Sequence, residues 1–492
     1  MLLFWPLVIP FLIAVACLLC HRSGAAQRGL SLLGALVLLA VAARILARVI
    51  VSGPFAEQAG GWVAPFGITM VADGLSATMV LLVGIVAVVT TVFGFTDVTK
   101  TETRAGHHPL TNALLAGLCG AFLTGDIFNM YVWFEVMLIS SFGLLVIGGG
   151  PAALDGAMKY AGLNLIATVA FISGVGLLYG TTGALNMADL HQRLQGRGGE
   201  TAILVPAAFL IFAFGSKAAL FPAFFWLPAS YHTPSFTSSA LFAALLTKVG
   251  VYSLIRVFTL VFPIEDTAIQ TTLLWGAALT MIVGAFGALA QDSPRRVLNF
   301  TIISSIGYMI LGLALHTPLA MLGAVYSLFQ DVIVKANLYL AAGAAARLAG
   351  AESFGRTGGL WRAHPWFAAL FLLPALSVAG VPPFAGFWGK LILVRATLEI
   401  GAGALTALIL VVGLLTLFAI ARVWSELFWK PAREASSPTR LPATVWAILL
   451  LLAGLVTWIG LEAGPFIDAA AGVAAGLVDP AAYIAAVLGG PR

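Results

Sequence analysis

The sequence predicts an all-α polytopic membrane protein with about 14 transmembrane helices. Of its 492 residues, 61% are apolar and only 9% are charged, whereas a soluble domain is about 25% charged. The mean hydropathy is +1.03. One span and a short connection use roughly 35 residues, so the length allows about 14 spans. This arithmetic leaves no room for a large soluble catalytic domain.

Fourteen apolar runs follow one another along the chain, separated by polar or glycine- and proline-rich breaks such as residues 148–151. The tail after Gly464 is also apolar, but Pro465 and Pro480 interrupt it. We therefore expect this tail to lie at the membrane interface and not to form a fifteenth span. The fourteen runs cover residues 2–20, 29–51, 73–95, 110–125, 127–148, 158–180, 201–227, 236–262, 271–290, 298–315, 318–346, 366–398, 403–428 and 442–462.

The basic residues predict the orientation of the spans. Of the 25 Lys and Arg, fourteen fall after odd-numbered spans, and seven, Arg256 among them, fall on the opposite side. Short cytoplasmic loops carry an excess of Lys and Arg. The bias predicts odd-numbered connections in the cytoplasm and both termini on the outer side of the cell inner (plasma) membrane.

Four lysines and two carboxylates remain near the middle of predicted spans. An ionisable group at the bilayer centre costs at least about 2.5–3.5 kcal/mol, so these six need a reason. They are either fixed ion pairs that hold helices together or groups that carry protons. Two acids cannot neutralise four lysines in pairs, and a low dielectric constant favours neutral amines, which favours proton transfer. The six residues are Glu135, Lys217, Lys248, Asp331, Lys335 and Lys390.

Prolines accompany two of these lysines. Pro222 and Pro228 follow Lys217, and Pro382 and Pro383 precede Lys390. Proline removes a backbone donor and clashes with the preceding turn, so both spans are predicted to break in mid-membrane. Broken helices at that depth line polar cavities, and one in each half of the chain is typical of an inverted-repeat transporter.

Two of these six residues lie close together in the sequence, and two further residues are secondary candidates. Asp331 precedes Lys335 by four positions, which places both on one helix face, as a static ion pair or as a pair that shares a proton. His232 lies at a cytoplasmic connection and is a secondary candidate that titrates near neutral pH. Asp126 is the other secondary candidate, with a role in ion uptake or simply as a helix cap.

Motifs for other chemistries are missing from the sequence. We find no glycine-rich phosphate loop, no His or Cys cluster with metal-ligand spacing and no nucleophile motif. We therefore expect no cofactor and no resident metal ion, no nucleic-acid partner and no enzyme activity of the chain's own. The driving energy must come from an ion gradient or from a partner subunit.

Several stretches resemble the antiporter-like subunits shared by complex I and Mrp-type cation/proton antiporters, and in particular the D subunits of Mrp antiporters. The resemblance covers essentially the whole chain. The Lys390 position favours the Mrp type, because several complex I relatives carry glutamate there. The stretches are residues 124–138 (TGDIFNMYVWFEVML), 214–217 (FGSK), 226–232 (WLPASYH), 246–252 (LTKVGVY) and 380–390 (GVPPFAGFWGK).

The resemblance implies a domain organisation. Residues 1–109 hold spans one to three, residues 110–262 and 263–428 form two inverted five-helix repeats, and residues 429–492 hold span fourteen and the tail. The resemblance also implies that spans seven and twelve are the broken ones.

The resemblance further implies roles for the buried ions. Glu135 adjusts the proton affinity of Lys217, Lys248 relays the proton, and Lys390 hands it onward. Many relatives place a histidine near the lysine of span eleven. Residues 329–335 (FQDVIVK) contain none, so the two half-channels are expected to connect through Asp331, Lys335 and water.

These expectations define one principal function and two alternatives. The principal one is proton translocation within a multisubunit Na⁺(K⁺)/H⁺ antiporter, in which other membrane subunits, protons, Na⁺ or K⁺ and lipid are the partners. The first alternative is a proton-pumping subunit of a redox complex of the complex I or membrane-bound hydrogenase type. The second is a scaffold whose buried ions only hold subunits together.

Overall fold

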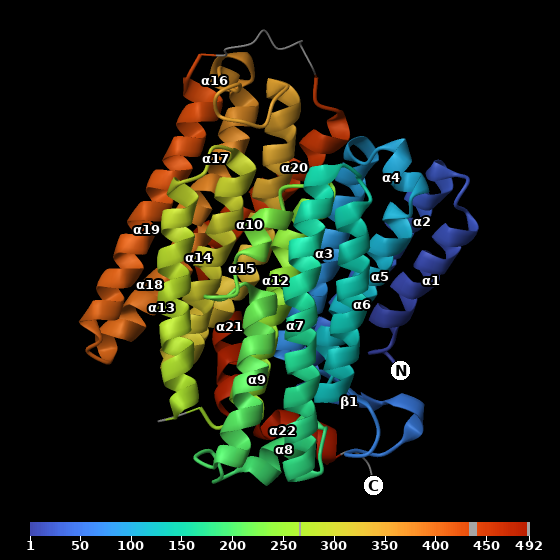
Figure 1. Cartoon of the computed structure of the whole chain (residues 1–492), viewed down its shortest axis with the longest axis vertical. Helices are drawn as coiled ribbons and strands as arrows, with labels where there is room; N and C mark the ends of the chain where they lie inside the picture. The colour runs from blue at the N-terminus through green and yellow to red at the C-terminus, as the bar shows by residue number, and fades with distance from the viewer. Residues whose placement is uncertain (265–266, 432–439, 490–492) are drawn as a thin grey trace.

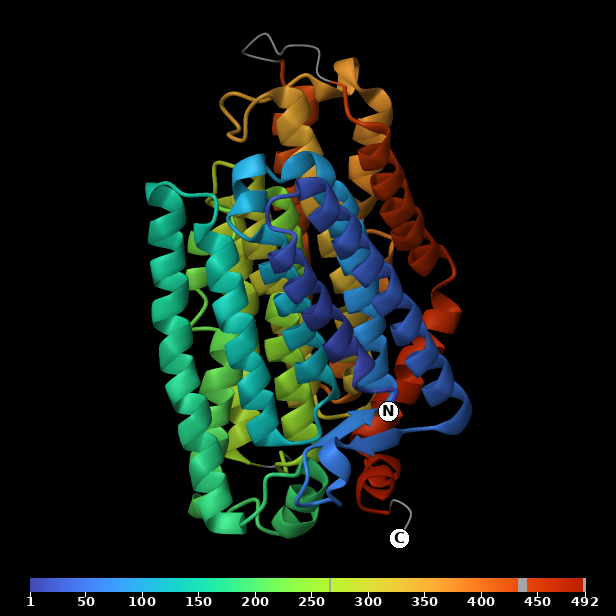
Figure 2. The same ribbon diagram turned by 90° about the vertical axis from the view of Figure 1, so that its right-hand side faces the viewer.

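The apolar runs form helices that stand side by side in one bundle (Figures 1 and 2). The structure is a computed structural model that describes residues 1–264, 267–431 and 440–489. Arg433 and Arg492, two of the basic residues assigned to the loops, lie outside the described residues.

The helices differ widely in length, from short turns to segments of 32 residues. Up to the middle of the chain they are α1 (Trp5–Leu19), α2 (Gly24–Ser52), η1 (Ala59–Gly61), α3 (Gly74–Asp97), α4 (Lys100–Arg104), α5 (His107–Leu123), α6 (Ile127–Val146), α7 (Pro151–Thr182), α8 (Met187–Leu194), α9 (Thr201–Ala218), α10 (Trp226–Ser230), α11 (Phe236–Leu241), the π-helix η2 (Phe242–Leu246) and α12 (Thr247–Leu260). After it follow α13 (Ala268–Leu289), α14 (Pro294–Leu315), α15 (Pro318–Ala349), α16 (Leu360–Ala363), α17 (Pro365–Ala379), α18 (Ala385–Glu399), α19 (Gly403–Trp424), the π-helix η3 (Ser425–Trp429), α20 (Ala443–Leu461), α21 (Ala463–Val478) and α22 (Ala481–Leu488).

Local sequence explains where many of these helices begin. Asp73 is the N-cap of α3 and accepts a hydrogen bond from the Ser76 N–H at 2.9 Å, which satisfies a donor that has no partner within the helix. Helices α7, α14, α15 and α17 each begin with proline. Proline suits the first helical position because its missing N–H would have no partner there.

The number of spans remains partly a prediction. Within the described residues, eleven helices are long and apolar enough to cross a membrane, or up to twelve if one bent pair counts as a single span. The predicted fourteen exceed this count. Helices α1 and α17 are apolar but have only 15 residues each, and α17 belongs to a span that is predicted to be broken.

Helices α11–α12, α14 and α15 form the centre of the bundle. In the most apolar stretch of these three segments, 94%, 89% and 78% of the residues are buried, compared with 33% in α2 and α19. Lys248, Asp331 and Lys335 lie on these central helices. The bundle therefore places half of the predicted buried ions in its interior.

A two-stranded hairpin closes one end of the bundle, and the sequence did not predict it. Strands β1 (Phe55–Gln58) and β2 (Thr69–Ala72) pair antiparallel, with Phe55 opposite Ala72. The backbone N–H of Leu2 donates to Glu57 in β1, and α22 also contacts β1. The first residues of the chain and α22 therefore both lie at the hairpin end (Figure 1).

The C-terminal tail differs from the expectation of an interfacial segment. Helix α21 packs against α15, α3, α12 and α20, so it belongs to the bundle. Pro465 does not interrupt the tail, because it lies in the first turn of α21, where proline is tolerated. The chain bends by 68° between α21 and α22, at Pro480. By length and composition, the bent pair qualifies together as a broken span or a re-entrant loop.

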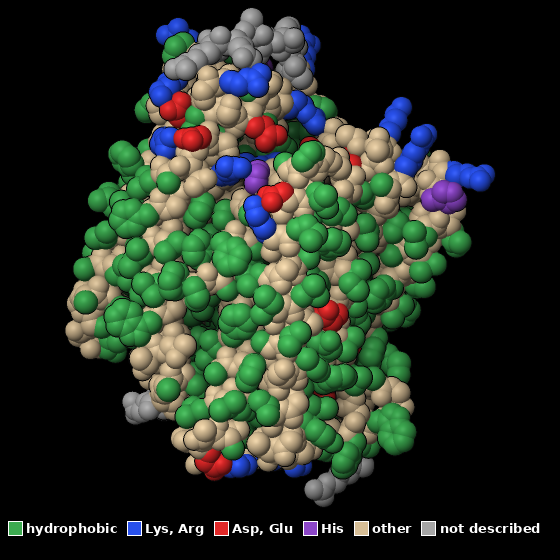
Figure 3. Space-filling view, viewed as in Figure 1, with side chains coloured by type: hydrophobic (Ala, Val, Ile, Leu, Met, Phe, Trp, Pro, Cys, Tyr) green, Lys and Arg blue, Asp and Glu red, His purple; other side chains and the backbone are tan. Residues whose placement is uncertain are grey.

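Charged side chains gather at the ends of the molecule. On the face shown in Figure 3, apolar side chains cover the middle, and most Lys and Arg side chains lie at the end opposite the hairpin. This distribution agrees with a membrane protein that has one strongly basic face.

Candidate proton path

The break after Lys217 begins where α9 ends. Ala219 follows with a φ of +63°, and the Leu220 N–H donates to the Gly215 carbonyl at 2.8 Å. Helix α17 ends in the same way, with Gly380 at a φ of +80° and the Val381 N–H on the Leu376 carbonyl at 3.1 Å. Both helices thus stop with a Schellman-type ending close to the prolines. The breaks that the prolines predict are therefore present.

Lys217 and Glu135 lie close together but form no ion pair in this structure. The Glu135 carboxylate accepts a hydrogen bond from the Thr168 hydroxyl of α7 at 2.7 Å. The Lys217 ammonium lies over the Phe134 ring, 5.7 Å from its centroid. The charge of Glu135 still acts on the ammonium electrostatically. We call this arrangement an open pair: the Glu135 carboxylate is hydrogen-bonded to α7 and not to Lys217.

Lys248 is fully buried on α12, directly after the π-helix η2. A π-helix shifts the hydrogen-bond register by one residue and frees carbonyl groups from the helix ladder. The carbonyl of Ala243, a residue of this π-helix, accepts a hydrogen bond from the Lys248 ammonium at 2.9 Å. The local winding of the helix therefore supplies a ligand for the buried charge.

Asp331 joins two lysines from different parts of the chain. Its Oδ2 atom lies 2.7 Å from the Lys248 Nζ, and its Oδ1 atom lies 3.9 Å from the Lys335 Nζ. The four-residue spacing predicted the second contact, but the tighter partner comes from α12. Lys335 also donates to the Thr301 hydroxyl at 2.8 Å. Asp331 is therefore shared, and the three ions form one cluster at the centre of the bundle.

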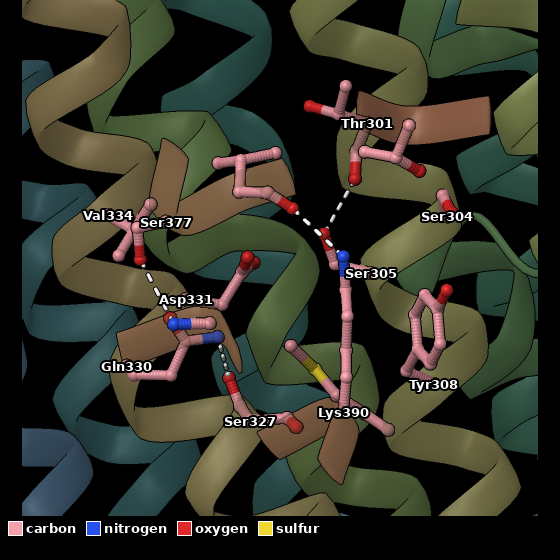
Figure 4. Close-up of a pocket in the computed structure, with 14 residues that line it drawn as sticks. Thr301, Ser304, Ser305, Tyr308, Ser327, Gln330, Asp331, Val334, Ser377 and Lys390 are labelled. Atoms are coloured by element: carbon pink, nitrogen blue, oxygen red, sulfur yellow. Dashed lines mark hydrogen bonds between the residues drawn. The ribbon is translucent and has the colours of Figure 1, made fainter. Parts of the chain in front are cut away.

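Lys390 reaches into a polar cavity between α14, α15, α17 and α18 (Figure 4). Its ammonium donates to the carbonyls of Val378 and Ala379 at 3.1 and 3.0 Å, which the end of α17 leaves free. The cavity has a volume of about 30 Å³, which is room for at least one water molecule. Its polar lining consists of Thr301, Ser304, Ser305, Tyr308, Ser327, Gln330, Asp331, Ser377, Lys390 and Thr416.

Apart from the Asp331 Oδ2, which forms no hydrogen bond but lies 2.7 Å from the Lys248 ammonium, two atoms of this lining have no hydrogen-bond partner within the described part of the chain, the Ser304 Oγ and the Gln330 Oε1. Buried polar atoms are almost always paired with protein or with ordered water. Water in the cavity would satisfy both atoms and would connect Asp331 with Lys390. The predicted link through Asp331 and water thus has a cavity of suitable size and polarity.

The two secondary candidates, His232 and Asp126, take part in local hydrogen bonds. His232 lies between α10 and α11, where burial and the neighbouring Arg296 lower its pKa to about 4, contrary to the expectation that it titrates near neutrality. Its Nδ1 lies 2.9 Å from the Pro228 carbonyl, and its Nε2 lies 3.2 Å from Arg296. Asp126 is the N-cap of α6 and accepts from the Asn129 N–H at 2.7 Å. Burial raises the pKa of Asp126 to about 6.

Arg256 and Asp73 form a buried ion pair that the sequence did not predict. The Arg256 Nη2 lies 2.7 Å from the Asp73 Oδ1, and the arginine side chain is only 3% exposed. The positions of the basic residues predict Arg256 in an outer connection, but the residue lies within α12. Its distance of eight residues from Lys248 was the available signal, since positions i, i+4 and i+8 belong to one broad face of a helix.

Gly250 allows α12 to approach α9 beside Lys217, and its replacement by alanine is our first prediction. A Cβ atom at Gly250 would lie 2.8 Å from the Phe214 carbonyl oxygen and would also contact the Ala218 amide nitrogen. These are backbone atoms of α9, which cannot move aside as a flexible side chain could. We therefore expect Gly250→Ala to destabilise the fold by about 1–3 kcal/mol. Thermal unfolding of the purified complex measures the loss.

Gly454 on α20 provides the matched control, since a Cβ atom there meets nothing within 4 Å. We expect Gly454→Ala to unfold at the wild-type temperature or slightly above, because alanine favours helix. Equal melting temperatures for the two variants would contradict the close approach at Gly250.

A bundle of apolar helices, broken beside buried lysines and joined at its centre by a shared carboxylate, is the architecture of an ion-translocating membrane protein. The model of the family described as "NADH:quinone oxidoreductase/Mrp antiporter, TM" matches residues 124–416. The chain belongs to this family, which confirms the resemblance seen in the motifs.

Individual relatives are similar over nearly the whole chain. The chain is 37% identical to the D subunit of the Na(+)/H(+) antiporter of Bacillus subtilis (strain 168), over 98% of both chains. It is 39% identical to the D subunit of the Na(+)/H(+) antiporter of Alkalihalophilus pseudofirmus, again over 98% of both. Among solved structures, a chain of the Mrp complex from Dietzia sp. DQ12-45-1b superposes with a TM-score of 0.90, at 29% identity and 99% coverage of both chains.

Proposed function

We propose that this chain is the proton-translocating subunit of a multisubunit Na⁺(K⁺)/H⁺ antiporter, and hence a secondary transporter subunit. The relatives named as Na(+)/H(+) antiporter subunits and the similar chain of the Mrp complex support this function and its partners. They favour an antiporter over a redox complex. The observation that carries the proposal is the central cluster in which Asp331 bridges Lys248 and Lys335.

In the first half of the chain, a proton is taken up on Lys217 and passed to Lys248. Closing the pair between Glu135 and Lys217 stabilises the protonated amine, and opening it favours release, because an opposite charge nearby favours the charged form. The open pair, with Glu135 held by Thr168, corresponds to the releasing arrangement. The close packing of α12 against α9 at Gly250 keeps the two lysine-bearing helices together.

In the second half, the proton moves from the central cluster to Lys390. Asp331 contacts Lys248 and Lys335 and also lines the polar cavity that Lys390 enters. Water bound in the cavity connects the two groups, so no direct contact is needed. Lys390 then hands the proton onward.

We further propose the predicted topology for this path. Residues 110–262 and 263–428 form the two inverted repeats, and the matching ends of α9 and α17 support this division. The basic face opposite the hairpin is cytoplasmic, and both termini lie on the outer side of the plasma membrane.

Lys390→Ala in the purified whole complex tests the proposed function. In vesicles, addition of Na⁺ or K⁺ to the wild-type complex should drive proton movement, and the variant should lose this exchange at least about 100-fold, the usual scale of a lost proton carrier. Lys159→Ala is the control, because Lys159 is an exposed lysine paired with Asp155. Exchange at the wild-type rate in a fully assembled Lys390→Ala complex would refute the role of Lys390.

A further inference from the structure

A line of polar side chains leads from the central cluster toward the hairpin end of the bundle. Lys248, Tyr252 and Arg256 follow one another on α12 at four-residue intervals, so they share one helix face. The two turns from Lys248 to Arg256 span about 12 Å. All three side chains are buried. The proposed proton path uses only the first of them.

The groups of this line have a definite order. The Tyr252 hydroxyl donates to the Phe122 carbonyl at 2.6 Å and accepts from the Arg256 Nε at 3.4 Å. On its other side, the Arg256 Nη2 donates to Asp73 at 2.7 Å. Hydrogen bonds thus join the phenol of Tyr252, the guanidinium of Arg256 and the carboxylate of Asp73, and the amine of Lys248 belongs to the preceding turn of α12. The positive guanidinium therefore lies between the line and Asp73.

The C-terminal tail covers this end of the line. The Arg256 guanidinium carbon lies 5.0 Å from the ring centroid of Tyr483 on α22 and 5.5 Å from that of Tyr252. Tyr483 is buried, and α22 in turn contacts β1 and α8. Two rings and a carboxylate hold the guanidinium in one place.

A guanidinium in this position blocks proton transfer along this line of side chains. Arginine stays protonated in proteins and has five donors but no acceptor, so it cannot accept a proton from Tyr252. A fixed arginine charge also repels protons and other cations that approach it, as in water-selective pores. A neutral group with an acceptor at the same place would extend the line to Asp73 and the hairpin end.

We infer that Arg256, held by Asp73 and Tyr483, is a barrier that prevents protons on Lys248 from leaking along α12 to the hairpin end of the bundle. This inference rests on the proposed function, because it assumes that Lys248 carries protons. The barrier keeps the proton on the route through Asp331 toward Lys390. Exchange of cations for protons depends on such a barrier, since a leak would dissipate the gradient without moving a cation.

Passive proton conductance of vesicles that contain the whole complex tests the barrier. With a pH gradient imposed and no Na⁺ or K⁺ gradient present, Arg256→Gln should raise the proton flux at least about tenfold over the wild type, which corresponds to about 1.4 kcal/mol of barrier. Arg256→Lys should also raise the flux, because a buried amine, unlike a guanidinium, can release its proton. Flux through Arg256→Gln at the wild-type level would overturn the inference.

Arg295→Gln is the matched control for a general loosening of the bundle. Arg295 is also a buried arginine, 7% exposed, whose Nη1 donates to the His232 carbonyl, away from α12. Equal leaks in both arginine variants would also overturn the inference. If Arg256→Gln fails to assemble, the double variant Arg256→Gln, Asp73→Asn decides, because it leaves no lone buried charge.

The leak assay is independent of exchange. A wild-type complex that exchanges no cations would contradict the proposed function, but the comparison of passive fluxes would still test the barrier.

Discussion

Lys217→Ala should abolish cation-dependent proton movement by the complex. Lys217 lies at the end of α9 and forms no hydrogen bond or ion pair among the described residues; its neighbours are the Phe134 ring and the charge of Glu135. Alanine leaves the first half-channel without a group that carries the proton, so we expect a loss of at least about 100-fold. Assembly should persist, because alanine is the best helix former. Proton flux on cation addition to vesicles measures the effect.

Lys217→Arg separates proton transfer from charge. Arginine keeps the positive charge beside Glu135 but does not release its proton, so we expect this variant to be as inactive as Lys217→Ala. Wild-type exchange in either variant, at normal abundance in the complex, would remove Lys217 from the path. Exchange by the arginine variant but not by the alanine variant would show that Lys217 acts as a fixed positive charge beside Glu135.

Asp331→Asn should impair both stability and transport. The substitution leaves Lys248 and Lys335 in the interior without the carboxylate that contacts both at 2.7 and 3.9 Å. Removing one partner of a buried ion pair costs about 3–5 kcal/mol, so we expect a clear fall in the melting temperature of the complex. Exchange should also be lost, because the proposed link between the half-channels passes through this group. Thermal unfolding and vesicle exchange measure the two effects.

Asp126→Asn is the control for Asp331→Asn. Asp126 caps α6 through the Asn129 N–H, and asparagine caps a helix about as well as aspartate. We expect stability and exchange close to those of the wild type. If Asp331→Asn behaved like Asp126→Asn in both measurements, the shared carboxylate would have no part in either property.

Local features of the sequence predicted much of the fold and most of the site. Composition alone indicates a membrane bundle, because 9% charge cannot cover a surface in water. The prolines near Lys217 and Lys390 predict where α9 and α17 end, because proline acts on its own turn. The spacing of Asp331 and Lys335 predicts a contact for the same local reason.

Contacts between distant segments could not be predicted in this way. The pairing of Lys248 with Asp331 depends on how α12 packs against α15, and no local pattern encodes that packing. Arg256 lies near the end of an apolar run, and position in the run does not distinguish a buried arginine from one in a loop. The hairpin and α21 were missed because their stability comes from the bundle they contact and not from their own periodicity.

Asp331 has a consequence for how the two halves of the chain communicate. The single negative charge of Asp331 contacts two amines, so when one protonated amine draws the carboxylate closer, the other loses part of its counter-charge. In the proposed path, a proton on one amine therefore disfavours a proton on the other, because like charges repel. The two halves of that path would be coupled through the displacement of one side chain, without a rearrangement of the helices.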